Sequence, residues 1–140
     1  MIRYVETSAL TRWLFGGEHR DAIAGALAAP GQIVASRLTV AEANRTVVRL
    51  LATGAIDEGI AARAREAIAL LAARWTVVGV ADDLLMRAGQ PFPAEPIRAL
   101  DAIHLATALT VREAAGELEV VSTDERVRAN ARLLGFPVLP

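Results

Sequence analysis

The sequence predicts a three-layer α/β fold, in which a central parallel sheet of four or five strands is flanked by helices. Short β-branched segments alternate along the chain with longer helical segments rich in alanine and leucine. No two strands are joined by a hairpin-length turn before the last segment, so consecutive strands are expected to pair in parallel through helical crossovers. The 140 residues contain no linker, repeat or low-complexity tract. We therefore expect a single domain over residues 1–140.

The first predicted strand is Ile2–Glu6, which contains β-branched and aromatic residues. The Thr7–Ser8 pair that follows is typical of a helix N-cap, and a helix is predicted over Ala9–Phe15, ended by two glycines. A second helix is predicted over His19–Ala29, closed by a Pro-Gly dipeptide. The β-branched segment Gln32–Ala35 then predicts the second strand.

The middle of the chain predicts two long helices and a third strand. Leu38–Ala52 has helical periodicity with a glycine shortly after its end, and Asp57–Arg74 is an amphipathic segment rich in alanine and arginine. Trp75–Val80 predicts the third strand and Ala81–Ala88 a short helix. Gly89–Pro96 contains three of the six prolines and is predicted to be a loop that presents the next helix.

Leu100–Leu109, with the sequence LDAIHLATAL, is apolar on nearly all sides when drawn as a helix, which indicates a buried helix. Its only acid is Asp101 in the first turn, and His104 one turn later is expected to be a packed or hydrogen-bonded core residue. Leu118–Ser122 predicts the fourth strand. Thr123 or Asp124 then caps a last helix to about Leu134, and Phe136–Leu139 predicts an edge strand.

Composition excludes several classes of protein. All 15 basic residues are arginine, so a P-loop and Schiff-base chemistry, which both need lysine, are excluded. The absence of cysteine excludes disulfides and thiol nucleophiles. The formal net charge is −1, which does not by itself indicate a nucleic-acid-binding protein. The N-terminus does not resemble a signal peptide and no apolar run reaches about 18 residues, so we expect a soluble, cytoplasmic protein.

Four acidic residues are expected at one edge of the sheet. Glu6 closes the first strand, Asp124 follows the fourth, Asp101 begins a helix, and Glu42 lies one turn into the helix after the second strand. Ligands of open α/β sheets bind beyond the carboxyl ends of the strands, which is where these side chains are predicted to meet. Four carboxylates gathered there need a compensating positive charge, and Mg²⁺ with oxygen ligands is the usual one.

Each acid also has a simpler explanation. Glu42 shares a helical face with Arg45 and Arg49 and can form a surface ion pair there. Asp101 can complement the helix dipole, and Asp124 can serve only as an N-cap. An acid that ends an apolar strand, as Glu6 does, is costly unless something pairs with it. One shared cause accounts for all four positions more simply than four separate ones.

The chain resembles the PIN domain, and more narrowly the VapC toxins of bacterial toxin–antitoxin modules. The strings that carry the resemblance are YVETSAL, LTVAEANR with its Glu42, LDAIHLATAL and VVSTDERVRANARLLG, which follow one another along the whole chain. The resemblance implies a parallel sheet between helices and an endoribonuclease that depends on Mg²⁺ or Mn²⁺. By position it implies a catalytic cluster of Glu6, Glu42, Asp101 and Asp124, with Glu6, Asp101 and Asp124 as metal ligands. The neighbouring hydroxyls of Thr7, Ser8 and Ser122 are expected to support a metal-bound water or a ligand carboxylate.

One position departs from the family pattern, because Glu6 stands where the family normally has Asp. Glutamate keeps the charge but moves the oxygens outward by up to about 1.5 Å, one C–C bond length. Mg²⁺ tolerates misplaced ligands poorly, and a displacement of about 1 Å can cost around a hundredfold in rate. Three outcomes stay open: a natural variant that adapts by a backbone shift, a weakened enzyme, and a deliberate change that disarms a toxic protein.

Positive charge around the acidic pocket is expected to come from arginines. The residues predicted to contact RNA phosphates are Arg12, Arg45, Arg126 and Arg128. The resemblance also implies a homodimer and a small VapB-like antitoxin as partners. Two alternatives remain: a catalytically disarmed PIN-fold module that binds RNA or protein, and, more weakly, a haloacid-dehalogenase-type phosphohydrolase. The latter would need Asp-x-Asp and a lysine, whereas the chain has Glu6-Thr7-Ser8 at that place.

Overall fold

The protein, described over all 140 residues by a computed structural model, is built on a five-stranded parallel sheet with strand order β3-β2-β1-β4-β5. The strands are β1 (Ile2–Val5), β2 (Gln32–Ser36), β3 (Thr76–Val78), β4 (Leu118–Val121) and β5 (Val138–Leu139). Strand β1 lies in the middle and pairs with β2 on one side and β4 on the other. The predicted fold class and sheet are confirmed, including the edge strand at the end of the chain.

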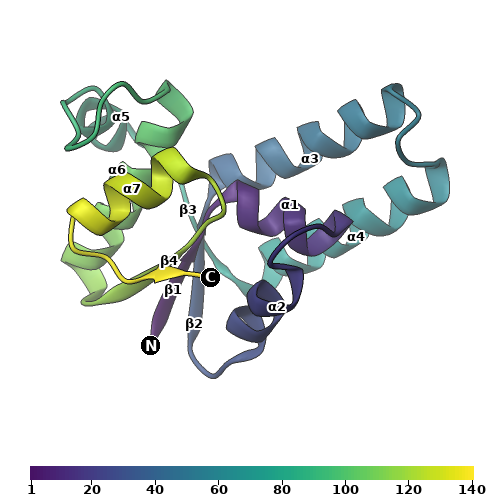
Figure 1. Cartoon of the computed structure of the whole chain (residues 1–140), viewed down its shortest axis with the longest axis horizontal. Helices are drawn as coiled ribbons and strands as arrows, with labels where there is room; N and C mark the ends of the chain where they lie inside the picture. Colours follow the sequence, from purple (N-terminus) through teal and green to yellow (C-terminus); the bar gives the residue numbers. More distant parts are fainter.

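Helices cover both faces of the sheet (Figure 1). On one face lie α1 (Thr7–Phe15), α2 (Arg20–Ala28), α3 (Arg37–Ala52) and α4 (Glu58–Arg74). The helices on the other side are α5 (Asp82–Ala88), α6 (Ala99–Ala115) and α7 (Glu125–Leu133). Helices α3 and α4 pack against each other as a long hairpin whose tip projects from the rest of the molecule.

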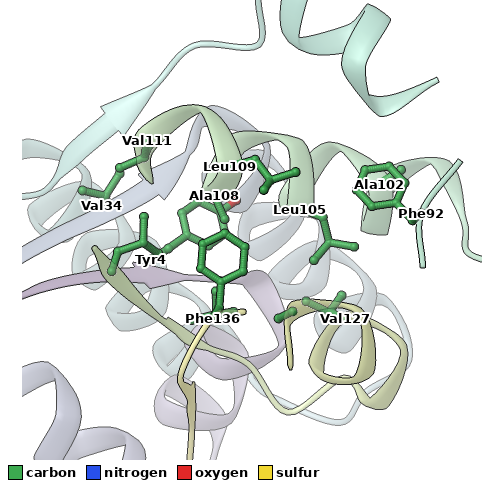
Figure 2. Close-up of a cluster of buried hydrophobic side chains, with 13 residues drawn as sticks. Tyr4, Val34, Phe92, Ala102, Leu105, Ala108, Leu109, Val111, Val127 and Phe136 are labelled. Carbon is green, nitrogen blue, oxygen red and sulfur yellow. The ribbon is translucent and has the colours of Figure 1, made fainter. Parts of the chain in front are cut away.

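The sheet separates two hydrophobic clusters because neighbouring strand residues point to opposite faces. Tyr4 and Val120 belong to the cluster beneath α6 and α7, while Val5 and Val121 belong to the cluster beneath α1, α3 and α4. Figure 2 shows the first cluster, in which Tyr4 lies close to side chains of α6 and to Phe136. Both clusters therefore meet at β1 and β4, the strands that lead to the predicted acidic edge.

Helix α6 is the buried helix that its sequence predicts. Nine of its 17 residues are buried, and they lie around most of its circumference. The helix is longer than the predicted Leu100–Leu109 and continues to Ala115, where Gly116 with a φ of 95° ends it. Leu100, in the first turn, is an exception to the burial, since 45% of it is exposed.

Apart from α6, the elements begin and end within two residues of the predicted bounds, and two of the differences have a clear cause. Helix α1 begins at Thr7, because the carboxylate of Glu6, rather than the Thr7–Ser8 pair, accepts the free N–H of Ser8 as the N-cap. Strand β3 spans only Thr76–Val78 because it pairs along one side with the end of β2 and has no neighbour on the other. Neither shift changes which face of the sheet a residue occupies.

Candidate active site

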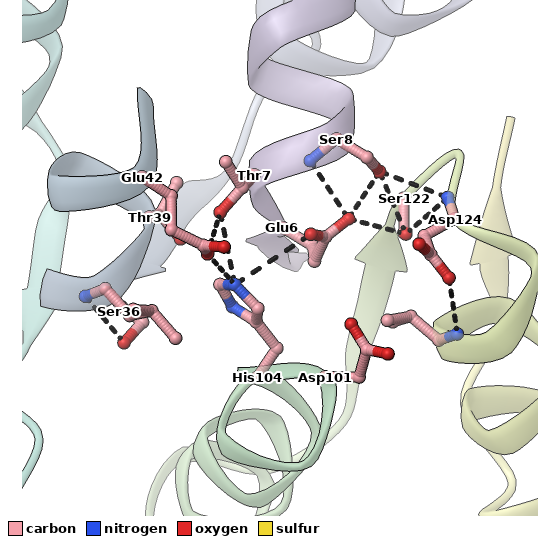
Figure 3. A network of polar contacts seen from close by, with 12 residues as sticks. Glu6, Thr7, Ser8, Ser36, Thr39, Glu42, Asp101, His104, Ser122 and Asp124 are labelled. Carbon is pink, nitrogen blue, oxygen red and sulfur yellow. Dashed lines mark hydrogen bonds and ion pairs between the residues drawn. The ribbon is translucent and has the colours of Figure 1, made fainter. Parts of the chain in front are cut away.

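The acidic side chains from four segments lie together at the carboxyl edge of the sheet (Figure 3). Glu6 directly follows β1, and Asp124 follows β4, whose last residue Val121 is paired in register with Val5. Glu42 comes from α3 on one side of the sheet and Asp101 from α6 on the other. Glu6 and Asp101 are each only 5% exposed. The convergence expected from the order of strands and helices is therefore present.

One oxygen of Glu6 is held by three donors from two segments. Its Oε2 accepts a hydrogen bond from the backbone N–H of Ser8 at 3.1 Å and from the hydroxyl of Ser122 at 2.8 Å, and the Ser8 hydroxyl also donates to it. The Ser8 hydroxyl in turn accepts from the backbone N–H of Thr123 and Asp124 at 2.8 and 3.1 Å. The other oxygen, Oε1, lies 3.8 Å from His104 Nε2, beyond hydrogen-bond distance. Glu6 thus uses one oxygen to join β1 to the β4 loop and keeps the second free.

Glu42 is held by Thr7 and His104. Its Oε1 accepts from the Thr7 hydroxyl at 2.7 Å and lies 2.7 Å from His104 Nε2. On its other side the His104 ring places Nδ1 2.7 Å from the Tyr4 hydroxyl. A bare Nε2 would repel the carboxylate, so Nε2 carries a proton and donates to Glu42, while in the neutral ring Nδ1 accepts from Tyr4. His104 is 1% exposed, which matches its expected role as a hydrogen-bonded core residue.

Hydrogen bonds and burial set the ionisation of Glu42 and Tyr4, which lie at the two ends of the Glu42–His104–Tyr4 chain. Burial acts to raise the pKa of Glu42, but the hydrogen bonds from His104 and Thr7 outweigh it, helped by the positive charge of Arg98, and the pKa is lowered. Burial, with a contribution from the charge of Glu6, raises the pKa of Tyr4 well above its ordinary value. Glu42 is therefore ionised and Tyr4 protonated at neutral pH.

Arg98, just before α6, joins the remaining two acids. Its Nε lies 3.0 Å from Asp101 Oδ2, and its terminal NH2 nitrogen lies 3.3 Å from Asp101 Oδ1 and 3.1 Å from Asp124 Oδ2. The pKa of Arg98 is raised, mainly by its hydrogen bonds to Asp101 and next by the negative charge of Asp101. Arg98 is not among the residues predicted from the sequence. Its position three residues before Asp101, at the start of the same helix, is the signal that could have indicated this pairing.

The four arginines expected to bind RNA have different surroundings. Arg45 lines a groove of about 530 Å³ together with Glu42 and Thr7, so it lies beside the acidic cluster. Arg126 is exposed in the first turn of α7, next to Asp124.

The other two lie differently. Arg12 is exposed on α1, where its guanidinium lies against Gly17. Arg128 instead donates to the backbone carbonyls of Ser122 and Pro140, each at 2.7 Å, and its side chain is 12% exposed. These contacts make Arg128 a brace between the β4 loop and the end of the chain, with little capacity left to bind a phosphate.

The donor chemistry of the cluster suits a hard divalent cation. Its oxygens are carboxylates and hydroxyls, the ligands that Mg²⁺ and Mn²⁺ prefer. No three acidic or histidine side chains are gathered closely enough to hold one ion between them. Glu6, Asp101 and Asp124 therefore do not form a ready three-residue cage. They fit the mode in which a cation is held through one or two carboxylates and completes its shell with waters and substrate oxygens.

The fold and this edge define an α/β domain that gathers carboxylates above the carboxyl ends of a parallel sheet. Residues 3–133 match the PIN domain family model. The chain belongs to the PIN domain family, whose members are typically nucleases that use a divalent metal.

Two solved structures share this fold. One is VapC20 from Mycobacterium tuberculosis, a toxin that cleaves the sarcin–ricin loop, with a TM-score of 0.69 and 19% identity over 99% of both chains. The other is VapBC2 from Rickettsia felis bound to a DNA fragment from their promoter, with a TM-score of 0.66 and 13% identity over 99% of this chain and 97% of that one. No curated protein matches the chain significantly. None of the helices is both long enough and apolar enough to span a bilayer.

Proposed function

We propose that the protein is a divalent-metal-dependent endoribonuclease of the VapC type, the toxin of a toxin–antitoxin pair. The observation that supports this most directly is the meeting of Glu6, Glu42, Asp101 and Asp124 at one edge of a PIN-domain sheet. The likeness to VapC20, a toxin that cleaves the sarcin–ricin loop, agrees with it. Carboxylates arranged in this way serve phosphodiester hydrolysis through a metal-activated water.

One or two of the three proposed ligands Glu6, Asp101 and Asp124 would hold the cation, which when bound would supply a water of lowered pKa and stabilise the leaving oxygen. The protein's own part is positioning. Ser8 and Ser122 fix Glu6, so that its free Oε1 stays at the edge of the sheet. His104 and Thr7 keep Glu42 ionised and oriented, so that it can accept a proton from the attacking water or hold that water by a hydrogen bond.

The groove beside Glu42 provides a surface for the RNA strand. Arg45 and Arg49 line it together with the exposed Val48 and Leu100. Arginines bind phosphate oxygens without reading sequence, and the apolar side chains offer a surface for a base. We place Arg45 and Arg126 at the phosphate backbone and give Arg12 a peripheral position.

A VapB-like antitoxin and a second copy of the chain are the proposed protein partners. The likeness to VapBC2 supports an antitoxin partner. Helices α3 and α4 expose Val48, Ile60 and Leu70, which offer apolar area for either contact. Light scattering of the purified protein, alone and co-expressed with a candidate VapB-like antitoxin, would test both partners.

Cleavage of a structured RNA by the purified protein in Mg²⁺ or Mn²⁺ tests the activity. Glu6→Gln and Asp101→Asn keep the shape of each side chain but remove its charge, so each should lower the cleavage rate at least a hundredfold. Glu66→Gln, the same chemical change at an exposed site on α4, should leave the rate unchanged. Cleavage that persists in EDTA, or in both site variants, would rule out this mechanism.

The disarmed alternative rests on Glu6 itself and is separated by Glu6→Asp. In the structure the longer side chain is matched to Ser8 and Ser122, so the native glutamate is expected to support cleavage. If only the aspartate variant cleaves RNA, the chain is a disarmed PIN domain. If neither protein cleaves any RNA with either metal, the enzymatic proposal fails.

A further inference from the structure

Arg98 fully occupies one carboxylate of the acidic cluster and shares a second. Its guanidinium contacts both oxygens of Asp101 and Oδ2 of Asp124, so one side chain bridges the start of α6 and the start of α7. The remaining oxygen of Asp124, Oδ1, accepts from the backbone N–H of Arg126 and Val127 as the N-cap of α7. With Arg98 in this position, neither aspartate has an oxygen free of protein donors.

The charges explain why Arg98 is held there. Asp101 is buried, and it shares the guanidinium of Arg98 with Asp124, so the positive charge of Arg98 offsets the repulsion between the two carboxylates. Arg98 is the one basic side chain that makes an ion pair with either of them. It therefore supplies the positive charge that the cluster needs when no metal is bound, and any cation that uses the same oxygens has to replace it.

The contact is built to be reversible. The side chain of Arg98 is 63% exposed, so water can solvate its guanidinium as soon as it leaves the aspartates. The backbone of Arg98 stays in place when the guanidinium leaves, because its N–H is held by Asp101 at the start of α6 and its carbonyl accepts from Ala102. Displacement thus needs a side-chain rotation and no change in the fold.

The displaced guanidinium remains at the mouth of the pocket. Arg98 lines a hollow of about 180 Å³ together with Glu42, Ala99, Leu100 and Asp101, so it lies between the acidic cluster and solvent. A planar guanidinium binds two phosphate oxygens as readily as two carboxylate oxygens. Once a cation neutralises the aspartates, the guanidinium of Arg98 is available to bind a substrate phosphate.

We propose that Arg98 is an internal counter-ion that competes with the divalent cation for Asp101 and Asp124 and, once displaced, binds a phosphate of the RNA. The inference rests on the proposed nuclease function, and it makes Arg98 a substrate-binding residue whose availability depends on the metal.

Mn²⁺ titration by calorimetry tests the first half. Arg98→Gln should bind Mn²⁺ about tenfold more tightly than the native protein, because the competing charge is gone. Arg98→Lys, which keeps the charge but cannot span both aspartates, should fall between the two. Arg65→Gln removes another exposed arginine, on α4, and should bind as the native protein does. Thermal unfolding of each variant checks that the fold is retained.

RNA binding tests the second half of the proposal, that the displaced Arg98 binds a phosphate. Here Arg98→Gln is expected to weaken binding, whereas it should strengthen the binding of Mn²⁺. In a Glu42→Gln background, which prevents turnover, adding Arg98→Gln should weaken the binding of a short RNA about fivefold in saturating Mn²⁺ and leave it unchanged in EDTA. A purely structural role for Arg98 would weaken both kinds of binding together.

Unchanged or weaker Mn²⁺ affinity in Arg98→Gln overturns the inference, and so does the absence of Mn²⁺ binding to every variant. If the native protein cleaves RNA but Arg98→Gln binds Mn²⁺ no more tightly, this inference fails and the proposed nuclease stands. If Arg98→Gln does bind Mn²⁺ more tightly while no variant cleaves RNA, the proposed nuclease fails instead.

Discussion

His104 connects the hydrophobic core to the acidic edge through its two ring nitrogens. One nitrogen meets Tyr4, in the cluster beneath α6, and the other meets Glu42 on the opposite side of the sheet. Because both partners are fixed by the fold, the proton on Nε2 faces the carboxylate. His104, which the sequence predicts to be a packed or hydrogen-bonded core residue, thus holds the carboxylate of Glu42, although α6 comes four elements after α3 in the chain.

Removing the Tyr4 hydroxyl tests this support. Tyr4→Phe leaves His104 Nδ1 buried without its donor, so we expect a loss of about 1–3 kcal/mol in the free energy of unfolding, measured with urea. Tyr4 is fully buried, so the loss should not be offset by water. A variant as stable as the native protein would show that the hydrogen bond to Nδ1 is not made.

The lowered pKa of Glu42 predicts a pH-dependent stability. A carboxylate whose pKa is lower in the folded than in the unfolded protein stabilises the fold above its unfolded pKa, here near 4.5, and loses this effect as the pH falls through the folded value. Glu42→Gln should therefore cost about 1 kcal/mol at pH 7, the scale of one hydrogen bond. The difference from the native protein should shrink at a second, acidic pH, as the pH falls below 4.5. Urea unfolding at both pH values measures it.

At the residue scale the positions of the four acids were predictable from the sequence, whereas the side chains that pair with them were not. The four carboxylates follow from strand order, because the ends of parallel strands and the starts of the following helices share one edge. Arg98 was missed because its charge becomes meaningful only when α6 and α7 are brought side by side. Arg128 was expected at the rim for the same reason, since the carbonyls that hold it come from segments placed by the tertiary structure.

At the scale of elements, the acids also begin the helices. The side chain of Glu6 caps α1 and that of Asp124 caps α7. An N-cap acid complements the positive end of a helix as well as its free N–H groups. The simpler explanation of Asp124 as a cap is therefore correct, and it is compatible with a role in the pocket because the carboxylate has two oxygens.

Two substitutions separate these roles of Asp124. Asp124→Asn keeps a good capping residue, so the melting temperature should change by no more than about 2 °C, while loss of the charge should lower Mn²⁺-dependent RNA cleavage at least tenfold. Asp124→Ala should lose activity and also about 1 kcal/mol of stability. If the asparagine variant is as destabilised as the alanine variant, the cap does not operate as described.

The elements themselves were largely predictable, whereas their ends were less so. Helix α6 is recognisable from the sequence because a helix that is apolar on nearly all sides is stable only when it is buried. The start of α1 was placed two residues late because Thr7 and Ser8 are good caps by type, and only the backbone course after β1 decides that Glu6 takes that role.

At the scale of the molecule, the two hydrophobic clusters share the strands that carry the site. Trp13 and Trp75 both pack against the cluster beneath α1, α3 and α4, whereas Leu105 belongs to the other. Leu105→Ala should cost about 2–5 kcal/mol. If residues 1–140 form one cooperative domain, tryptophan fluorescence and far-ultraviolet circular dichroism should report the same lowered urea midpoint.

Leu133→Ala is the control, because Leu133 is largely exposed and its truncation should cost less than about 0.5 kcal/mol. A Leu105→Ala protein whose fluorescence transition stays at the native midpoint would show that the two halves unfold independently.

The position of β1 between the two helical layers has a consequence for cation selection. Glu6 directly follows β1 and Asp101 reaches the pocket from α6, so the packing of α6 on β1 sets the gap between these two proposed ligands. A bulkier residue on that face of β1 would widen that gap by tenths of an ångström, which a packed core can absorb. A small octahedral ion is less tolerant than a larger one, so packing far from solvent would decide the preference between Mg²⁺ and Mn²⁺.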